Sequence, residues 1–408
     1  MRLTIDRLGH LGDGIAPGPV FVPGALPGEE VEGEVTGDRM QAPRIVAPSP
    51  DRVRAACPHY RACGGCNLMH ASDDFIAEWK KDVVRSALSG QALEAPVRSI
   101  TTSPPNSRRR ATLSGRRTRK GVVVGFHGRA SDTVVPIPGC LLLRRELLAA
   151  LPAMEEITAI GASRKGELSL TVTLSDGGID MALTGGKPLE PGLFSALAAI
   201  AGKADLARLT WDGETVVTAR PPVQRFGRAM VLPPSGGFLQ ATREGEAALS
   251  AFVAEAVGTA RRVADLFAGS GTFALPLAET AEVHAVEGEV DAIAALDAGW
   301  RRAAGLHRVA TETRDLFRRP LLPDELRAFD AVVIDPPRAG AEAQCTELAR
   351  SGVPVVAMVS CNPVTFARDA RIMCHGGYAI DWVEVVDQFR WSPHVELVAR
   401  LSRRISKS

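Results

Sequence analysis

A single thiol, Cys361, follows the short apolar run Val353 to Val359 in the stretch VPVVAMVSCNPVTFARD. Such a β-branched run is typical of a buried parallel strand, and ligands in open α/β sheets bind at the carboxyl ends of the strands. A cysteine at that position can act as a nucleophile through its thiolate. A buried structural cysteine is the commoner case when one thiol is considered alone. The catalytic interpretation therefore depends on the motifs that precede it.

Acidic residues end the strand-like runs upstream of Cys361. The stretch RRVADLFAGSGTFALPLAET indicates a strand that ends near Asp265, a turn freed by Gly269 and Gly271, and a helix. A nucleotide typically binds at such a turn, although two glycines alone are weak support. Glu287 ends the next run, where a carboxylate can accept hydrogen bonds from ribose hydroxyls. The two runs that follow are also succeeded by carboxylates, Asp315 and Asp335.

Three cysteines crowd near the start of the chain, in the stretch AACPHYRACGGCNLMH. Cys57, Cys63 and Cys66 are separated by five and then two residues, and two glycines in the second gap allow a tight turn around a ligand. Candidates for a fourth ligand are His59, His70 and the distant Cys140. Four thiolates suit either zinc or an iron–sulfur cluster, and the spacing does not choose between them. The five-residue gap argues against the radical enzymes that use S-adenosylmethionine.

The elements that must position these groups differ along the chain. Residues 1–52 alternate short β-like runs with Gly and Pro turns, which predicts a small OB-like β-barrel. Residues 53–235 hold the cysteine module, an amphipathic helix over Ser72 to Leu88, and β-like stretches, which predicts a central β-rich domain. Residues 236–408 alternate strands and helices, the pattern of a doubly wound parallel sheet. We therefore expect an α/β protein of three domains.

Positive charge is concentrated in one segment although the net charge of the chain is only +1. Residues 95–131 contain no Asp or Glu, and their basic residues are Arg98, Arg108, Arg109, Arg110, Arg116, Arg117, Arg119, Lys120 and Arg129. A basic run is usually a solvated face, but the absence of any acid favours a phosphate backbone as partner. The segment around Arg108 to Lys120 is thus predicted to contact a phosphate backbone.

The composition indicates a protein of the cytoplasm. Its 408 residues include no apolar stretch as long as a bilayer span, and the start MRLTIDRLGHLGDG lacks the apolar core of a signal peptide. Seven cysteines, an odd number, disfavour a disulfide framework and favour metal binding or catalysis. We expect no membrane association, and nothing in the sequence calls for an obligate protein partner.

Several motifs in order make the chain resemble the bacterial RNA uracil-5-methyltransferases, class I enzymes that use S-adenosylmethionine to form 5-methyluridine. They are CPHYRACGGCNLMH with the later Cys140, GGFLQ, DLFAGSGTF, VEG, IDPPRAG, VSCNP and HVELVARL. The resemblance runs nearly end to end, and the front of the chain is similar to the TRAM domain, an OB-like RNA-binding barrel. It implies a class I methyltransferase domain at the C-terminus.

The resemblance also implies roles for individual residues. Cys361 would add to carbon 6 of uracil, which activates carbon 5 for methylation, and Glu396 would remove the carbon 5 proton. The cofactor contacts would be Gln240, Phe267, Glu287, Asp315 and Asp335. In this family four cysteines hold a four-iron four-sulfur cluster, and the corresponding ligands here would be Cys57, Cys63, Cys66 and Cys140. The target uridine would have to be flipped out of the folded RNA.

Three alternatives stay open at this point. Ribosomal RNA of the large subunit is favoured as substrate, because the cluster cysteines and a TRAM-like front occur together in those family members, whereas tRNA is the other possibility. An amino-group methyltransferase would use IDPPR but leave Cys361 and Glu396 without a role. A noncatalytic RNA-binding protein would bind RNA without S-adenosylmethionine. Zinc in place of the cluster is a further alternative.

Overall fold

The computed structural model describes residues 1–404. Two small antiparallel sheets form the N-terminal β unit (residues 1–50), with strand orders β1-β5-β6 and β2-β3-β4. The strands are β1 (Arg2–Thr4), β2 (Arg7–Leu8), β3 (Asp13–Ala16), β4 (Val20–Pro23), β5 (Glu30–Glu32) and β6 (Arg44–Ala47). Val22, Val31 and Met40 are fully buried between them, so this unit has an apolar core of its own.

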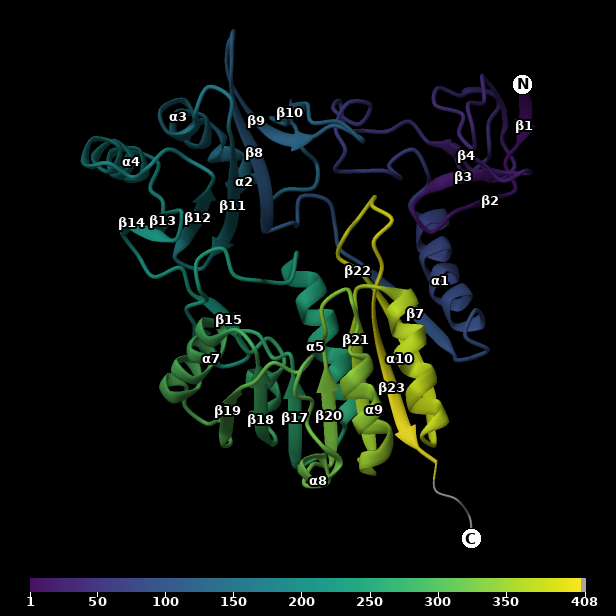
Figure 1. The fold of residues 1–408 in the computed structure, drawn as a ribbon, viewed down its shortest axis with the longest axis vertical. Coiled ribbons are helices and arrows are strands. Elements are labelled where there is room, and N and C mark those ends of the chain that lie inside the picture. Colours follow the sequence, from purple (N-terminus) through teal and green to yellow (C-terminus); the bar gives the residue numbers. More distant parts are fainter. Residues whose placement is uncertain (405–408) are drawn as a thin grey trace.

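Helix α1 (Asp73–Ser89) runs between the N-terminal β unit and the C-terminal sheet (Figure 1). It begins at Ser72, whose side chain accepts a hydrogen bond from the N–H of Phe75, the usual N-cap arrangement. Trp79 donates its indole N–H to the carbonyl of Leu8 at 3.5 Å. Lys80, on the neighbouring face, forms a buried ion pair with Asp387 at 2.5 Å. The helix is therefore fastened to both neighbours.

The central domain is built on a seven-stranded sheet of order β10-β9-β8-β11-β12-β13-β14. Its strands are β8 (Arg110–Thr118), β9 (Gly121–His127), β10 (Val134–Pro136), β11 (Glu167–Ser175), β12 (Gly178–Thr184), β13 (Arg208–Trp211) and β14 (Glu214–Thr218). Its helices are α2 (Arg145–Ala149), α3 (Leu151–Gly161) and α4 (Pro191–Lys203). A hairpin of β15 (Gln224–Phe226) and β16 (Ala229–Val231) leads to the C-terminal domain.

The C-terminal domain contains an eight-stranded sheet of order β19-β18-β17-β20-β21-β23-β22-β7. Its strands are β7 (Val97–Thr102), β17 (Arg262–Leu266), β18 (Glu282–Glu287), β19 (Val309–Thr313), β20 (Ala331–Ile334), β21 (Val355–Ser360), β22 (Tyr378–Asp387) and β23 (Glu396–Arg403). The strands β17 to β21 are paired in parallel, whereas β23 lies antiparallel between β21 and β22.

Helices cover both faces of this sheet. They are α5 (Arg243–Val257), α6 (Ala274–Leu277), α7 (Val290–Arg302), α8 (Pro323–Leu326), α9 (Glu342–Ser351) and α10 (Pro363–His375). Successive residues of β17 alternate between two apolar cores, since Val263 faces one core while Ala264 and Leu266 face the other. Burial on both faces explains the continuous apolar runs in the sequence. The predicted α/β class with a doubly wound sheet is confirmed.

One strand of this sheet comes from a distant part of the chain. β7 precedes the central domain, and it pairs in parallel with β22 through contacts such as Ile100 with Val385. Residues 97–102, which the sequence pattern assigned to the central range 53–235, thus complete the sheet of the C-terminal domain. Across residues 1–404, no helix combines the length and the apolar character that a membrane crossing requires.

Candidate active site

Cys361 and Glu396 lie at adjacent strand ends of the C-terminal sheet. Cys361 follows the last residue of β21, and Glu396 is the first residue of the antiparallel neighbour β23, in which Leu397 pairs with Ser360. Glu396 is buried, with 3% of its surface exposed, and Cys361 is half-buried. Burial together with the nearby carboxyl groups of Glu396 and Asp335 raises the pKa of the Cys361 thiol to about 11.

The turn that carries Cys361 is fixed by Asn362. The Asn362 side chain accepts a hydrogen bond from the N–H of Val364 at 3.1 Å, which caps α10. It also donates to the carbonyl of Arg338 at 3.0 Å, in the turn after β20. Cys361 lines a cavity of about 590 Å³ that is walled by the N-terminal β unit, α1 and the C-terminal domain. The thiol therefore faces a cavity that an external molecule can enter.

Three carboxyl groups stand at neighbouring strand ends beside Cys361: Asp265 and Glu396 are buried, and Asp335 is half-buried. Burial raises the pKa of Glu396 to about 7, and that of Asp265 to about 8. The pKa of Asp335 is raised well above its usual value by burial and by the charges of Glu396 and Asp265. Among the residues described, neither oxygen of Asp265 has a hydrogen bond of normal geometry. This cluster of acids is an environment in which a cationic ligand group would be stabilised.

Glu287 holds the glycine turn after β17. Its Oε2 accepts a hydrogen bond from the N–H of Gly269 at 2.9 Å, and its Oε1 accepts one from the N–H of Glu289 at 2.8 Å. Gly271 has a φ of +100°, and a Cβ there would lie only 2.7 Å from a Leu275 methyl group, so glycine is required. Glu287 therefore shapes the turn that the sequence predicted to bind a nucleotide.

An aromatic pair borders the same end of the sheet. The rings of Phe267 and Phe317 have centroids 5.4 Å apart, and Phe317 is 51% exposed. Phe267 has a φ of +63°, a conformation rare for a non-glycine residue and often found at functional sites. Asp315 fixes the backbone of Phe317 by accepting a hydrogen bond from its N–H at 3.0 Å. The sequence pattern contained no signal for Phe317.

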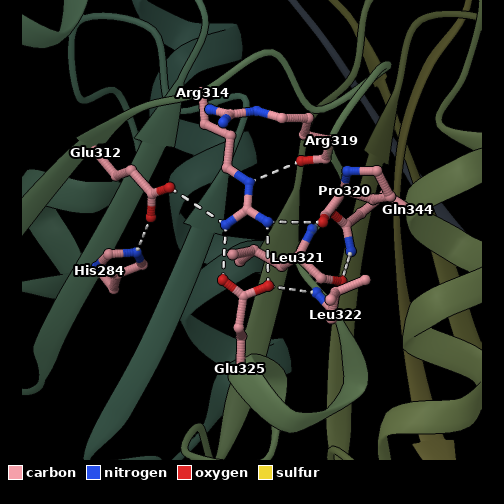
Figure 2. A network of polar contacts seen from close by, with 9 residues as sticks. All are labelled: His284, Glu312, Arg314, Arg319, Pro320, Leu321, Leu322, Glu325 and Gln344. Atoms are coloured by element: carbon pink, nitrogen blue, oxygen red, sulfur yellow. Dashed lines mark hydrogen bonds and ion pairs between the residues drawn. The ribbon is translucent and has the colours of Figure 1, made fainter.

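A polar network anchors the loop that carries Asp315 and Phe317 (Figure 2). The Arg314 guanidinium makes two hydrogen bonds to the Glu325 carboxylate, at 2.7 and 3.1 Å, and one to Glu312 at 3.2 Å. It also donates to the carbonyls of Arg319 and Pro320, so all three guanidinium nitrogens are engaged. Such a forked arrangement fixes orientation as well as distance. The loop after β19 is thereby held against α8.

Gln240 is joined to Glu396 through a second glutamine, Gln388. Gln388 donates its side-chain N–H groups to Oε1 of Gln240 at 2.6 Å and to Oε2 of Glu396. Gln240 is 1% exposed, and its own Nε2 has no partner among the described residues. A buried donor without an acceptor is costly, so this atom is placed to meet a ligand. The sequence pattern did not single out Gln388.

The arginines at the start of the predicted RNA-binding segment bind protein groups instead. Arg109 is 3% exposed, forms an ion pair with Glu246 at 2.5 Å, and donates to the carbonyl of Gln240. Arg110 donates to the carbonyls of Gly236 and Gly237. These contacts fix the segment that contains Gln240. The expectation that the whole run binds phosphate is thus corrected, because Arg109 and Arg110 already bind protein groups. Arg117, Arg119 and Lys120 are exposed.

The four cysteines of the predicted metal site line one pocket. Cys57, Cys63, Cys66 and Cys140 surround it together with Tyr60 and Phe126. Burial and the neighbouring thiols raise the pKa of Cys66 to about 12. Over residues 1–404, no three metal-binding side chains are close enough to hold a single ion. The four thiols therefore share one pocket, but the described residues are not arranged around a metal ion.

A family model described as tRNA (uracil-5-)-methyltransferase matches residues 228–404. An uncharacterized RNA methyltransferase of Brucella suis is 44% identical, with 98% of each chain covered. The 23S rRNA (uracil(1939)-C(5))-methyltransferase of Halomonas elongata is 34% identical, covering 97% of this chain and 88% of that protein.

A solved structure has a similar fold over the full length. It is the tRNA (uracil-54, C5)-methyltransferase of Pyrococcus abyssi in complex with S-adenosyl-L-homocysteine, with a TM-score of 0.76 and 24% identity. The match covers 98% of this chain and 99% of that one. At this level of identity the likeness concerns the fold.

Proposed function

This chain belongs to the RNA (uracil-5-)-methyltransferases, enzymes that methylate carbon 5 of uridine with S-adenosylmethionine, and on that premise we propose how its residues divide the reaction. The observation that carries the proposal is the pairing of Cys361 with Glu396 at adjacent strand ends, beside one cavity. A nucleophile and a base of the required kinds stand side by side there. An amino-group methyltransferase would need neither.

Cys361 is proposed to add to carbon 6 of the target uracil. The new C–S bond moves the electron pair of the carbon 5–carbon 6 double bond, so that carbon 5 becomes nucleophilic and takes the methyl group. Glu396 then accepts the proton from carbon 5. The electrons of that C–H bond restore the double bond as the C–S bond breaks, and Cys361 is released. Cys361 thus leaves as a thiolate, Glu396 is regenerated when it loses the proton to solvent, and the methyl donor leaves as S-adenosylhomocysteine.

S-adenosylmethionine, which supplies the methyl group, is proposed to bind along the strand ends from Gln240 to Asp315. Asp265 and Asp335 suit its positively charged methionine end, because Asp265 is buried without a hydrogen bond of normal geometry among residues 1–404 and burial raises the pKa of Asp335. Phe267 and Phe317 offer an aromatic wall, and Asp315 stands beside them. Glu287 would act chiefly by shaping the glycine turn. Of these residues, Asp265 and Phe317 extend the set expected from the sequence.

Cys57, Cys63, Cys66 and Cys140 are proposed to hold a four-iron four-sulfur cluster. The support for this assignment is that all four thiols line one pocket and that thiolates are the usual ligands of such clusters. The cluster would supply a structural cross-link, because the methylation requires no electron transfer. Anaerobically purified protein should absorb in the visible range and lose this absorbance in Cys66→Ser, whereas Cys345→Ser should retain it. Colourless wild-type protein would contradict this part of the proposal.

RNA is proposed to reach Cys361 through the cavity between the N-terminal β unit and the C-terminal domain. Arg7 and Arg338 line this cavity and can contact phosphate groups. Ribosomal RNA is the favoured substrate, because the Halomonas relative that matches over most of its length acts on 23S rRNA. tRNA is the alternative, since the family model carries that name. We propose that the protein acts in the cytoplasm, where such RNA is modified.

Mass-spectrometric mapping of 5-methyluridine in ribosomal RNA and tRNA tests this proposal. RNA from cells without the gene should lack one modification, which the intact gene restores and Cys361→Ala does not. Cys374→Ala is the matched control, because this thiol is also half-buried but lies within α10, away from the cavity. If 5-methyluridine is lost from tRNA alone, the proposed reaction stands but ribosomal RNA is not the substrate. Full restoration by Cys361→Ala would overturn the mechanism.

A further inference from the structure

Gln388 is held firmly at the end of β22. Only 3% of its surface is exposed, and it directly follows Asp387, whose carboxylate is paired with Lys80 in the buried ion pair. Lys80 also donates to the carbonyl of the next residue, Phe389, at 3.3 Å. The Cβ of Gln388 packs against Gly245, where an added Cβ would approach it to 2.7 Å. Both the backbone and the side chain of Gln388 are therefore confined.

The contacts of Gln388 determine which end of its amide faces which group. The backbone N–H of Ala241 points at Oε1 of Gln388, with a distance of 2.8 Å. A backbone N–H can only donate, so the atom that faces it must be the amide oxygen. The amide NH₂ then has to face the two remaining neighbours, Gln240 and Glu396. The orientation of Gln388 is thus fixed by chemistry.

This orientation determines which polar atoms of Gln240 and Glu396 remain available to other partners. Gln240 must accept with its Oε1, which leaves its Nε2 as an available donor. Glu396 must accept with its Oε2, which anchors one carboxylate oxygen, and Oε1 has no hydrogen-bond partner among the described residues. The hydrogen bond from Gln388 also opposes the effect of burial on the pKa of Glu396. The base is thereby held in one orientation.

We propose that Gln388 is a positioning residue that aims the Glu396 carboxylate at the carbon 5 proton. This inference rests on the proposed function and adds a residue to it. Gln388 touches neither RNA nor cofactor in this role, because all three of its side-chain contacts are to protein groups. Its effect should fall on proton removal, the step after methyl transfer. Proton transfer depends strongly on the orientation of the base.

The test compares two RNA substrates with the variant Gln388→Met, which keeps the length of the side chain without its polar groups. On ordinary uridine RNA, turnover should fall at least about tenfold, because general-base catalysis contributes about 10²–10⁴-fold. The methylated Cys361–RNA adduct should accumulate as a slow band on a denaturing gel. On 5-fluorouridine RNA the reaction stops before proton removal, so adduct formation should slow by less than about threefold.

The matched control is Gln224→Met, because Gln224 is also a buried glutamine, 2% exposed, and donates to the carbonyl of Leu174. It lies on β15, outside the site, and its variant should accumulate no adduct. Equal loss of turnover and of 5-fluorouridine trapping in Gln388→Met would overturn the proposal, since an earlier step would then be affected. Unchanged turnover on uridine RNA would overturn it as well.

A second variant covers the case in which Gln388→Met folds poorly. Gln388→Glu retains the shape and the contact to Ala241, but sets a carboxyl oxygen against Glu396. Two carboxyl groups then share one proton, so the acidic limb of the pH–rate profile should move to higher pH by about one unit or more. If the acidic limb of the pH–rate profile does not move in Gln388→Glu and no adduct accumulates, the positioning role of Gln388 is refuted. Cys361→Ala separates the two claims, because activity in that variant would refute the proposed function itself.

Discussion

Burial gives Cys361 and Glu396 the same dependence on pH. The thiol must lose its proton to attack, and its pKa is raised to about 11. Glu396 must be ionised to accept the carbon 5 proton, and its pKa is raised to about 7. Both requirements favour higher pH. At neutral pH, therefore, only a fraction of the molecules has both groups ionised. Binding of a cationic cofactor and exclusion of water can change the two pKa values.

Turnover should consequently rise with pH through the neutral range. Below a pH of about 7, Glu396 is protonated and proton removal slows, because its pKa is raised to about 7. Single-turnover rates on uridine RNA from about pH 6 to 8.5 measure this limb. In Glu396→Gln, turnover should fall by at least about 10²-fold and the covalent adduct should accumulate at every pH. A profile that is flat in the wild type would contradict the assignment of Glu396.

Asp265→Asn should have opposite effects on stability and on cofactor binding. The pKa of Asp265 is raised from 3.8 to about 8 in the folded protein, so the folded state holds a proton that the unfolded state has lost. Its contribution to stability is complete below about pH 4 and is lost as pH rises toward about 8. Asparagine does not ionise, so the variant does not lose stability in this way as pH rises. Its Tm without cofactor at pH 8 should therefore exceed that of the wild type.

The same variant should bind S-adenosylmethionine about tenfold more weakly or worse, since a charged hydrogen bond contributes about 1.5–3 kcal/mol. Calorimetry measures the affinity, and thermal scans at pH 5 and 8 measure the stability. Ser270 lies between Gly269 and Gly271 in the glycine turn. The variant Ser270→Ala serves as a control for effects that come from disturbing the turn itself. Unchanged affinity in Asp265→Asn would show that the cationic end of the cofactor lies elsewhere.

The sequence indicated the residues that we propose as catalytic better than the residues that we propose to support them. Cys361 and Asp335 were predicted at strand ends because a parallel sheet brings its carboxyl ends to one edge. Glu396 was assigned through the resemblance alone. Gln388 and Phe317 act through contacts with segments distant in sequence, and neither position has a local pattern. Whether a polar residue aims another residue depends on tertiary contacts, which periodicity and spacing do not encode.

At the scale of elements, the ion pair of Lys80 with Asp387 fastens α1 to β22. Both side chains are essentially unexposed. Lys80→Met should therefore lower the free energy of unfolding by about 3–5 kcal/mol, because it leaves a buried carboxylate without its partner. The double variant Lys80→Met/Asp387→Leu should recover much of this loss. Urea denaturation measures the free energy of unfolding of the double variant and of the single variants Lys80→Met and Asp387→Leu. If the loss in the double variant equals the sum of the two single losses, the pairing is contradicted.

Strand β7 and the two arginines Arg109 and Arg110 lie in other surroundings than the sequence suggested, for related reasons. β7 was not assigned to the C-terminal sheet, because its partner β22 lies at the other end of the chain. Arg109 and Arg110 were counted as surface charge, since the run contains no acid. In the fold, Glu246 and the carbonyls of residues 236, 237 and 240 surround them. Local composition revealed the charge but not the long-range contacts that bury it.

At the scale of the molecule, the cavity beside Cys361 is formed jointly by the N-terminal β unit, α1 and the C-terminal domain. Leu11 of the N-terminal β unit lines it and is 66% exposed. Leu11→Glu should raise KM for RNA about threefold to tenfold, because one unfavourable surface charge contributes about 1 kcal/mol. Affinity for S-adenosylmethionine should be unchanged. Phe194→Glu, an exposed position on α4, is the control. An unaltered KM would remove the N-terminal β unit from the substrate path.

The pairing of β7 with β22 affects how the protein is made. During synthesis β7 leaves the ribosome early, long before the strand beside which it belongs has been translated. Until then its open edge and the lone ammonium of Lys80 have no native partner, and an open edge invites pairing with other chains. The sheet can close only after β22 has been translated. Slow or interrupted translation should therefore favour aggregation of nascent chains.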